Sequence, residues 1–473
     1  MTETADFKAA LNPCRKIATR NKFYLATWRW HFYAGIFVIP FLIILSLTGL
    51  VMLYSDTIMA FQYPDQLFVV PSDHVVSAET QVEAVRNAYP GAVVNRYILP
   101  TAKNRSAQIA INTKDGQALT VFVNPYTAEV LGMLDESTTR YALANKVHGT
   151  LLLGAVGDHL IEIATGLAIM LVITGLYLWW PRNKQGIYGT LWPRFNKSKR
   201  ILWRDLHASV GFYMSVGLLF FLISGMAWTG VWGTQIVQAW SSFPAQKWTD
   251  IPLSDQTHAS LNHGELEEVP WNLEQTPLPA SGSLAGTDGL PADVPVNLDT
   301  VIAYAKDNGF TTFRVDLPRS ATGVYTVSAD TMSGDITDAR QDRTVHLDQY
   351  TGKKLADVRW SDYSLMAKSM AAGVALHNGN MGWLNMALNT LFCLATIFIS
   401  VSSIIIWWVR RPKGVFRLVA PPMPKNMPLW KGAVLIMVLV SLAFPLVGIT
   451  LLTVLVLDLV VISRVPVLKQ LFN

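Results

Sequence analysis

Four apolar stretches, each long enough to cross a lipid bilayer, limit this chain to the folds that a membrane protein can adopt. A hydrocarbon core of about 30 Å needs about 20 consecutive apolar residues in a helix. Such stretches run from Phe32 to Tyr54, His159 to Trp180, Leu206 to Trp232 and Gly382 to Val409. Because lipid offers the backbone no hydrogen-bond partners, each stretch is predicted to be a transmembrane helix.

The composition agrees with this prediction. The 473 residues are 51% hydrophobic and only 15% charged, whereas soluble proteins carry about 25% charged residues. Such a chain is not disordered, and it does not resemble an ordinary soluble enzyme, because so much apolar surface needs lipid to cover it. The two cysteines, Cys14 and Cys393, are too few for a disulfide framework or a cysteine-ligated cluster.

Basic residues predict the orientation in the membrane. The short loops 182–203 and 410–430 are rich in Arg and Lys, which is typical of cytoplasmic loops. Basic residues also precede the first apolar stretch, which is too long for a signal peptide and is predicted to be a signal anchor. Both termini are therefore expected in the cytoplasm, and the long segments 55–147 and 233–370 outside it.

The C-terminal apolar block, Gly432 to Ile462, is too long for one straight spanning helix. Pro445 lies near its middle, and Lys431 and Arg464 flank it. These features favour a helical hairpin with both ends in the cytoplasm, and a single kinked span is the alternative.

The chain contains an internal duplication, which is best sought before any fold is assigned. In WRWHFYAG at 28–35 and WRDLHASVG at 203–211 a glycine follows the histidine by four residues, and a second glycine follows by eighteen, at Gly49 and Gly225. The second and fourth stretches both end in a Trp-Trp pair. Outside the membrane, VFVNPYTAEVLG at 121–132 repeats as VHLDQYTGKKLA at 345–356. Each outer segment is predicted to be a small α+β domain, because a helix-like stretch precedes alternating strands.

The predicted fold class is therefore an α-helical integral membrane protein, with a four-helix bundle, a C-terminal helical hairpin and two small α+β domains. The predicted segments are the N-terminus 1–30, spans at 31–54, 148–181, 204–232 and 371–409, outer domains at 55–147 and 233–370, cytoplasmic loops at 182–203 and 410–430, the hairpin 431–463 and the tail 464–473.

Five of the nine histidines lie at the ends of predicted spans, which is informative because ionisable residues are scarce there. His31 and His207 lie at the cytoplasmic side, and His148, His159 and His377 lie at the outer side. Eighteen residues make five turns of an α-helix, so His31 and Gly49 share a helix face. His148, His159 and Gly166 also share one if their helix is continuous.

A histidine on a helix face that also carries glycines suits a porphyrin. Haem iron takes an axial imidazole, and glycines have no side chain that would clash with the flat ring. Two histidines from two helices fill both axial positions, which suits electron transfer. His31 and His207 are predicted to share one haem. His377 is predicted to share a second with His148 or His159, which makes the bundle a haem-binding one.

Simpler interpretations exist for each feature taken alone. Glycine stripes usually pack helices closely, and Trp pairs usually anchor helices at the interface. The repeated spacing at two depths favours haem over these interpretations, and the absence of HxxxH and CxxC motifs disfavours other metals. His346 is predicted to be structural, and His258 and His263 are predicted to be solvated in a loop.

The motifs resemble the PepSY-associated transmembrane family of bacterial inner-membrane proteins, which includes iron-regulated proteins and ferri-siderophore reductases. The matching motifs are WRWHFYAG at 28–35, VHGTLLLG at 147–154, TGLYLWWPR at 174–182, WRDLHASVG at 203–211 and ALHNGNMGWLN at 375–385. The segments at about 77–133 and 297–357 resemble PepSY domains.

The resemblance implies a haem-dependent reductase with two haem b groups, which passes electrons from the cytoplasm to a ferric siderophore or another ferric chelate in the periplasm. By motif, His31, His148, His207 and His377 take the role of axial ligands, and only geometry supports His159. No GxGxxG motif follows a strand, so the electron donor is expected to be a separate cytoplasmic reductase or reduced carrier. The lipid bilayer is the other partner, and no nucleic acid is expected.

Two other functions are kept as alternatives. A transporter for a siderophore or metal fits the parallel repeat, although no pair of broken mid-membrane helices is evident. A regulator of extracytoplasmic proteases fits the PepSY-like segments and needs no histidines at span ends. A protease is disfavoured because HExxH is absent.

Overall fold

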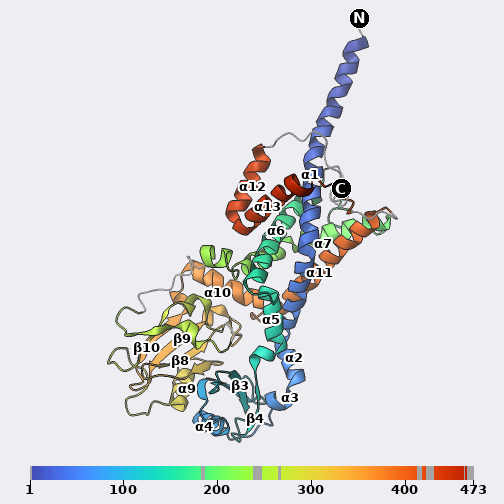
Figure 1. The fold of residues 1–473 in the computed structure, drawn as a ribbon. Helices are drawn as coiled ribbons and strands as arrows, with labels where there is room; N and C mark the ends of the chain where they lie inside the picture. Colours follow the sequence, from blue (N-terminus) through green and yellow to red (C-terminus); the bar gives the residue numbers. More distant parts are fainter. Residues whose placement is uncertain are drawn as a thin grey trace. The chain divides into compact units, whose positions relative to one another are not determined.

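The computed structural model describes residues 3–182, 187–237, 248–264, 268–412, 418–421, 431–462 and 464–465 (Figure 1). Parts of the predicted loops 182–203 and 410–430 and of the tail 464–473 therefore lie outside the described residues. The chain forms two compact units, which are described separately. The membrane unit comprises Met1–Gly49, Lys146–Val237 and Thr390–Asn473, and the sheet unit comprises Leu50–Asn145 and Gln238–Asn389.

Four helices among the described residues are long and apolar enough to cross a membrane. They are α1 (Glu3–Leu53, of which Lys22–Leu53 is the candidate span), α6 (Ala155–Trp179), α7 (Lys199–Met226) and α11 (Trp383–Arg410). The shortest has 25 residues, which makes about 37 Å of helix and exceeds a hydrocarbon core of about 30 Å.

Small residues allow the spanning helices to approach closely, as is common in membrane bundles. Val38 of α1 is buried together with Ala168 of α6 and Met226 of α7. Gly217 of α7 faces the ring of Phe392 of α11, and a methyl group at Gly217 would lie 2.0 Å from that ring. The glycine is therefore required by packing at this crossing.

The first tryptophan of each Trp-Trp pair holds the loop that follows it. The indole N–H of Trp179 donates to the carbonyl of Thr190 over 2.9 Å, and that of Trp407 donates to the carbonyl of Leu418 over 2.7 Å. In both cases the acceptor lies eleven residues further along the chain. This contact is repeated in both halves of the duplication, and it goes beyond the interfacial anchoring that the sequence suggested.

The second apolar stretch does not continue the helix before it. Helix α5 (Arg140–Thr150) ends where Leu151 and Leu152 adopt φ angles of 52° and 62°. These left-handed conformations are strained for residues with a side chain and break the helical hydrogen-bond pattern. His148 and His159 therefore lie on separate helices, and the shared face expected for a continuous helix does not exist.

The predicted C-terminal hairpin of two spanning helices is wrong. The block forms α12 (Lys431–Ala443), α13 (Pro445–Leu457) and a short π-helix, η8 (Asp458–Ile462). Pro445 begins a new helix because it has no N–H to continue the previous one. Each α-helix has 13 residues, about 20 Å, which is too short to cross the hydrocarbon core.

The sheet unit is built on one eight-stranded antiparallel sheet, with the strand order β10-β9-β8-β7-β1-β2-β3-β4. The first half contributes α4 (Ala78–Ala88), β1 (Val93–Ile98), β2 (Ala107–Asn112), β3 (Ala118–Val123) and β4 (Val130–Leu134). The second half contributes α9 (Leu298–Asp307), β7 (Arg314–Asp316), β8 (Val324–Ala329), β9 (Arg343–Asp348) and β10 (Lys354–Arg359). Each half is thus a helix followed by a four-stranded meander.

The predicted fold class is wrong, because the two outer segments form a single domain. Strands β1 and β7 pair with each other, with Tyr97 opposite Val315, and residues of both α4 and α9 share one core. As separate domains, the two halves would leave the outer edges of β1 and β7 without hydrogen-bond partners. The pairing of β1 with β7 removes both unpaired edges. Helices make up about 54% of the chain beside this large sheet, so a helical bundle with small appended domains does not describe it.

An insertion between the halves, described over residues 248–264 and 268–296, covers the sheet face opposite α4 and α9. Leu261 and Leu273 of this insertion are buried with Val358 of β10 and Ala367. The remaining elements are α2 (Ser55–Gln62), α3 (Pro64–Leu67), η1 (Glu136–Thr138), η2 (Gly233–Val237), β5 (Leu253–Thr257), η5 (His258–Leu261), α8 (Trp271–Glu274), β6 (Pro277–Pro279), η6 (Ala339–Gln341), η7 (Trp360–Asp362) and α10 (Leu365–Asn378).

Replacing Gly217 by Ala is expected to destabilise the membrane unit by about 1–3 kcal/mol, because the new methyl group overlaps the ring of Phe392. Gly373→Ala in α10 is the matched control, since a methyl group there meets no described atom within 4 Å beyond its own helix. The control is expected to be neutral or slightly stabilising. Thermal unfolding of the full chain in detergent measures both, and equal midpoints for the two variants would contradict this packing.

Candidate functional site

His31 of α1 is hydrogen-bonded to α6 in a way that fixes which ring nitrogen carries the proton. Its Nδ1 lies 2.9 Å from Oγ1 of Thr174. The hydroxyl of Thr174 donates to the carbonyl of Met170 over 2.7 Å, so its oxygen accepts from His31 and Nδ1 carries the proton. The lone pair is then on Nε2, which has no hydrogen-bond partner in the part of the chain that the structure describes.

His207 of α7 is held by α11 in the same manner. Its Nδ1 lies 3.0 Å from Oγ of Ser402 and 3.2 Å from the carbonyl of Ile399. A carbonyl only accepts, and Ser402 itself donates to Ile399 over 2.9 Å. Nδ1 of His207 is therefore the protonated nitrogen, and its Nε2 has no hydrogen-bond partner among the described residues.

Gly35 and Gly211 lie beside open space on the helices that carry His31 and His207. A methyl group at Gly35 or at Gly211, one helical turn after each histidine, would meet no described atom within 4 Å beyond its own helix. Both histidines that the sequence predicted for the first haem thus have open space on the expected helix faces.

His148 of α5 has the same kind of partner. Its Nδ1 lies 2.9 Å from Oγ1 of Thr48, whose hydroxyl donates to the carbonyl of Ile44 over 2.8 Å. Nδ1 therefore donates, and the lone pair is on Nε2. A methyl group at Gly49 would lie 3.7 Å from the imidazole of His148. Gly49 shares a helix face with His31, but it lies beside His148.

The remaining two candidate histidines differ from these three. His159 lies exposed near the start of α6, with no hydrogen bond to any described residue. His377 is partly buried near the end of α10, which belongs to the sheet unit. Its backbone carbonyl accepts from the amide of Asn389 over 2.9 Å, so the end of α10 is tied to the start of α11.

The donor set fits a porphyrin better than a bare metal ion. No group of three or more His, Cys, Asp or Glu side chains able to hold a metal occurs among the described residues. A porphyrin brings four nitrogen ligands of its own, so it needs only one or two imidazoles from the protein. Histidine that binds a metal through one nitrogen usually donates its other N–H to an oxygen, as His31, His207 and His148 do.

The histidines of the sheet unit are arranged differently. Nδ1 of His258 donates to the carbonyl of Thr276 over 2.8 Å, and its Nε2 lies 3.0 Å from Nε2 of His346. Both nitrogens of each ring are thus occupied, because Nδ1 of His346 is 3.0 Å from the hydroxyl of Thr326. Burial lowers the pKa of His258 to about 4 and that of His346 well below its ordinary value. The predicted solvation of His258 and His263 is wrong, because both are buried between the insertion that carries them and the sheet.

Two buried arginines organise the polar face of the sheet beneath the insertion. Arg96 of β1 donates to the carboxylate of Asp316 over 2.7 Å, to Glu268 and to the carbonyl of Leu261. Arg314 of β7 occupies the equivalent position in the other half. The two guanidinium groups are 1% and 3% exposed, so each needs the carboxylates that surround it.

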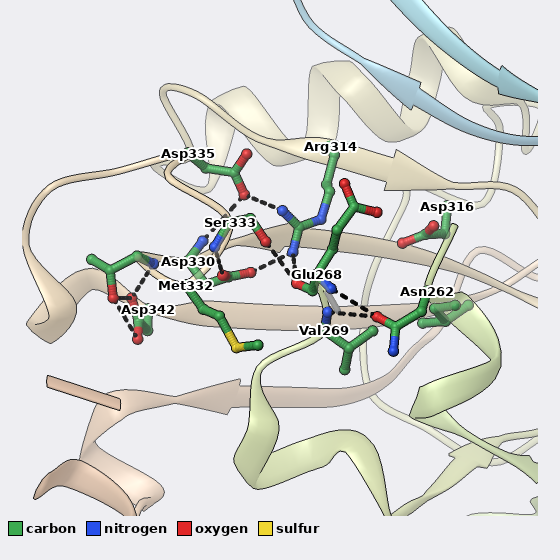
Figure 2. A network of polar contacts seen from close by, with 12 residues as sticks. Asn262, Glu268, Val269, Arg314, Asp316, Asp330, Met332, Ser333, Asp335 and Asp342 are labelled. Atoms are coloured by element: carbon green, nitrogen blue, oxygen red, sulfur yellow. Dashed lines mark hydrogen bonds and ion pairs between the residues drawn. The ribbon is translucent and has the colours of Figure 1, made fainter. Parts of the chain in front are cut away.

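Arg314 is the centre of the network in Figure 2. It donates to Asp330 over 2.5 Å, to Asp335 over 2.7 Å and to the carbonyl of Glu268 over 2.7 Å. Two carboxylates thus share one guanidinium, and burial raises the pKa of Asp335 to about 7. Burial and the neighbouring carboxylate of Asp330 also raise the pKa of Asp342 to about 7. This network holds the insertion on the sheet and needs no external ligand.

Two acidic residues of α6 have roles that no sequence motif predicts. Glu162 is 2% exposed and accepts from the backbone N–H groups of Val231 and Trp232, each over 3.1 Å. One turn earlier, Asp158 accepts from the N–H of Gly230 over 2.9 Å. Together they satisfy backbone donors just beyond the end of α7. The only available sequence signal was an acid inside an apolar stretch.

The spanning helices and the extramembrane sheet define a multi-pass membrane protein with a duplicated antiparallel α+β domain. The chain matches the family of the PepSY-associated TM region over residues 28–410, which is most of its length. It belongs to that family, as its motifs indicated. A comparison with curated proteins found no match.

Replacing Asp342 by Asn is expected to change how the stability of the sheet unit depends on pH. Since the folded-state pKa of Asp342 lies above the usual value of 3.8, this carboxyl favours the folded state less and less as the pH rises from about 4 to about 7. The variant lacks this loss, so its stability relative to the unaltered chain is expected to be about 1–3 kcal/mol higher at pH 8 than at pH 4.

Amide hydrogen exchange in β8 and β9 of the full chain measures this difference, and the exposed Asp307→Asn is the control. The amide that replaces the carboxylate in Asp342→Asn retains an oxygen that can accept from the N–H of Thr331, as the carboxylate does over 2.9 Å. The local fold is therefore expected to persist. A pH-independent difference between variant and unaltered chain would show that the carboxyl is not protonated in this range.

Proposed function

We propose that this protein holds haem b in the membrane and passes electrons to a ferric chelate, as a haem-dependent reductase that serves iron acquisition. The observation that supports this most directly concerns His31 and His207. They lie on two different spanning helices, each with Nδ1–H engaged by an oxygen and Nε2 without a partner among the described residues. This is the form in which imidazole binds iron.

The residues around this pair have separate tasks in the proposal. Nε2 of His31 and Nε2 of His207 would hold the cofactor, and Gly35 and Gly211 leave open space beside their helix faces. Haem bound there would supply single-electron transfer. The chain itself supplies the two imidazoles and an apolar surrounding.

A second haem, bound by His148 and His377, is the other part of the proposal. It rests on the family motifs at 147–154 and 375–385 and on the hydrogen bond from Nδ1 of His148 to Thr48. His159 is the less favoured candidate, because it is exposed and has no such partner among the described residues. The contrast favours His148 where the sequence left the choice open.

The basic loops predict the orientation in the membrane, and the family resemblance implies electron flow from the cytoplasm outward. The basic loops 182–203 and 410–430 favour a cytoplasmic location for the side of His31 and His207. We therefore place the electron donor, a separate reductase or reduced carrier, on the cytoplasmic side of the inner membrane. The ferric siderophore or other ferric chelate is on the periplasmic side. Reduction to Fe(II) weakens its hold in a chelate of hard oxygen ligands.

The protein purified from haem-replete cells is expected to show the absorption spectrum of haem b with two imidazole ligands. His31→Ala and His207→Ala are each expected to lose about half of the bound haem, and the same half, because both remove a ligand of one site. His148→Ala and His377→Ala are expected to lose the other half. A pyridine haemochrome assay on each variant measures this.

His74→Ala is the control, because His74 is exposed in the sheet unit and its replacement is expected to leave the haem content unchanged. A colourless unaltered protein, or equal haem loss from the His74 control, would rule out the proposed function. Substrate accumulation in vesicles that lack any electron donor would favour the transporter instead.

A further inference from the structure

Four hydroxyl residues of the spanning helices contact the candidate ligand histidines, although no sequence motif singled them out as such. Thr174 faces His31, Ser402 and, at 3.4 Å, Ser403 face His207, and Thr48 faces His148. We propose that Thr174 and Ser402 are positioning residues of the first haem site, which fix the ligating tautomer of His31 and His207 and lower the reduction potential of the iron. This inference rests on the proposed function.

The direction of each hydrogen bond follows from the helix that carries the hydroxyl. In a spanning helix a Ser or Thr hydroxyl donates to a carbonyl one turn earlier, because no water competes for it. Thr174 donates to Met170 over 2.7 Å, and Ser402 donates to Ile399 over 2.9 Å. Each hydroxyl has one proton and has used it, so it meets the imidazole only as an acceptor. The imidazole is therefore held with Nδ1 protonated and the lone pair on Nε2.

The two contacts are equivalent by the duplication of the chain. Thr174 lies five residues before Trp179, and Ser402 lies five residues before Trp407. Each of these tryptophans makes the same hydrogen bond to a carbonyl eleven residues later. The register between the histidine helix and the hydroxyl helix therefore occurs twice, once in each half, which argues against a chance contact.

The buried histidines of the sheet unit show that burial alone does not produce this arrangement. Nε2 of His258 and Nε2 of His346 lie 3.0 Å apart and bond to each other. Neither ring keeps a nitrogen available for a metal, although both are fully buried. At His31 and His207 the partner of Nδ1 is an oxygen from another helix, and Nε2 has no hydrogen-bond partner among the described residues.

A hydrogen bond from Nδ1–H to an oxygen makes the imidazole a stronger donor through Nε2. A stronger donor stabilises the ferric state more than the ferrous state, so the reduction potential falls. The two sites differ in one respect. Nδ1 of His207 also lies 3.2 Å from the carbonyl of Ile399 and 3.4 Å from Oγ of Ser403. Among the described residues, Nδ1 of His31 bonds only to Thr174. Removing the hydroxyl is therefore expected to affect His31 more than His207.

The test uses the full-length protein with its bound haem in lipid nanodiscs, and it compares Thr174→Val with Ser402→Ala. Thr174→Val keeps the side-chain shape but removes the acceptor, so the potential of one haem is expected to rise and its retention to weaken about tenfold or more. Ser402→Ala is expected to give a smaller shift of the same sign. Thr174→Ser is expected to restore the original potential, since it restores the hydroxyl.

Ser400→Ala is the matched control, because Ser400 lies on the same helix as Ser402 and is buried, but its hydroxyl contacts no partner among the described residues. It is expected to leave both potentials unchanged. Potentiometric titration followed by absorbance is the measurement, and the electron paramagnetic resonance signal of the ferric state reports the ligand geometry independently. Unchanged potentials in both Thr174→Val and Ser402→Ala would overturn the inference.

A second readout separates this inference from the proposed function. In the haem-free protein, ¹⁵N spectra of labelled histidine report which nitrogen carries the proton. The unaltered chain is expected to show the Nδ1-protonated form for His31, and Thr174→Val is expected to lose it. If the unaltered protein takes up no haem, the proposed function fails, and the tautomer result alone decides whether Thr174 positions His31. An unchanged tautomer in Thr174→Val would overturn that assignment.

Discussion

The hydrogen bond that a helical hydroxyl makes to its own backbone is the constraint on which the candidate site depends. In lipid this bond uses the only hydroxyl proton, so Thr174 and Ser402 present a lone pair to whatever lies beside them. An imidazole placed there must donate. The orientation of His31 and His207 is therefore decided by two neighbouring helices and not by the helices that carry the histidines.

A different constraint shapes the sheet unit. Each half of the duplicated chain is a helix and a four-stranded meander, and each half alone would expose the edge of its first strand. Pairing β1 with β7 removes both edges at once and brings Arg96 and Arg314 close to the centre of one sheet. Two cations in a buried position need anions. Asp316, Asp330 and Glu268 supply them, and the bonds to Glu268 also hold the insertion in place.

The sequence predicted features that depend on local spacing. Four apolar stretches and the repeated distance from His31 to Gly35 could be read directly, because helical periodicity relates position to face. Features that depend on which elements meet were missed. An alternating pattern predicts a strand but not that the strands of two distant segments will pair at their edges. Leu151 and Leu152 break a helix although leucine is not a residue type that signals a break. The contact of Thr174 with His31 could not be predicted for the same reason, because the sequence of one helix does not determine its register against another.

The two histidine environments show why residue type alone does not indicate function. His258 was predicted to be solvated because its neighbours are typical of a loop, yet the insertion carries it onto the sheet, where His346 accounts for its second nitrogen. His31 is partly buried on a spanning helix, and its one side-chain hydrogen bond among the described residues joins Nδ1 to the hydroxyl oxygen of Thr174. The informative quantity is thus how many ring nitrogens the protein itself satisfies. Where the protein bonds both nitrogens, the ring has a structural role. Where it bonds only one within a span, the other nitrogen can still accept a ligand.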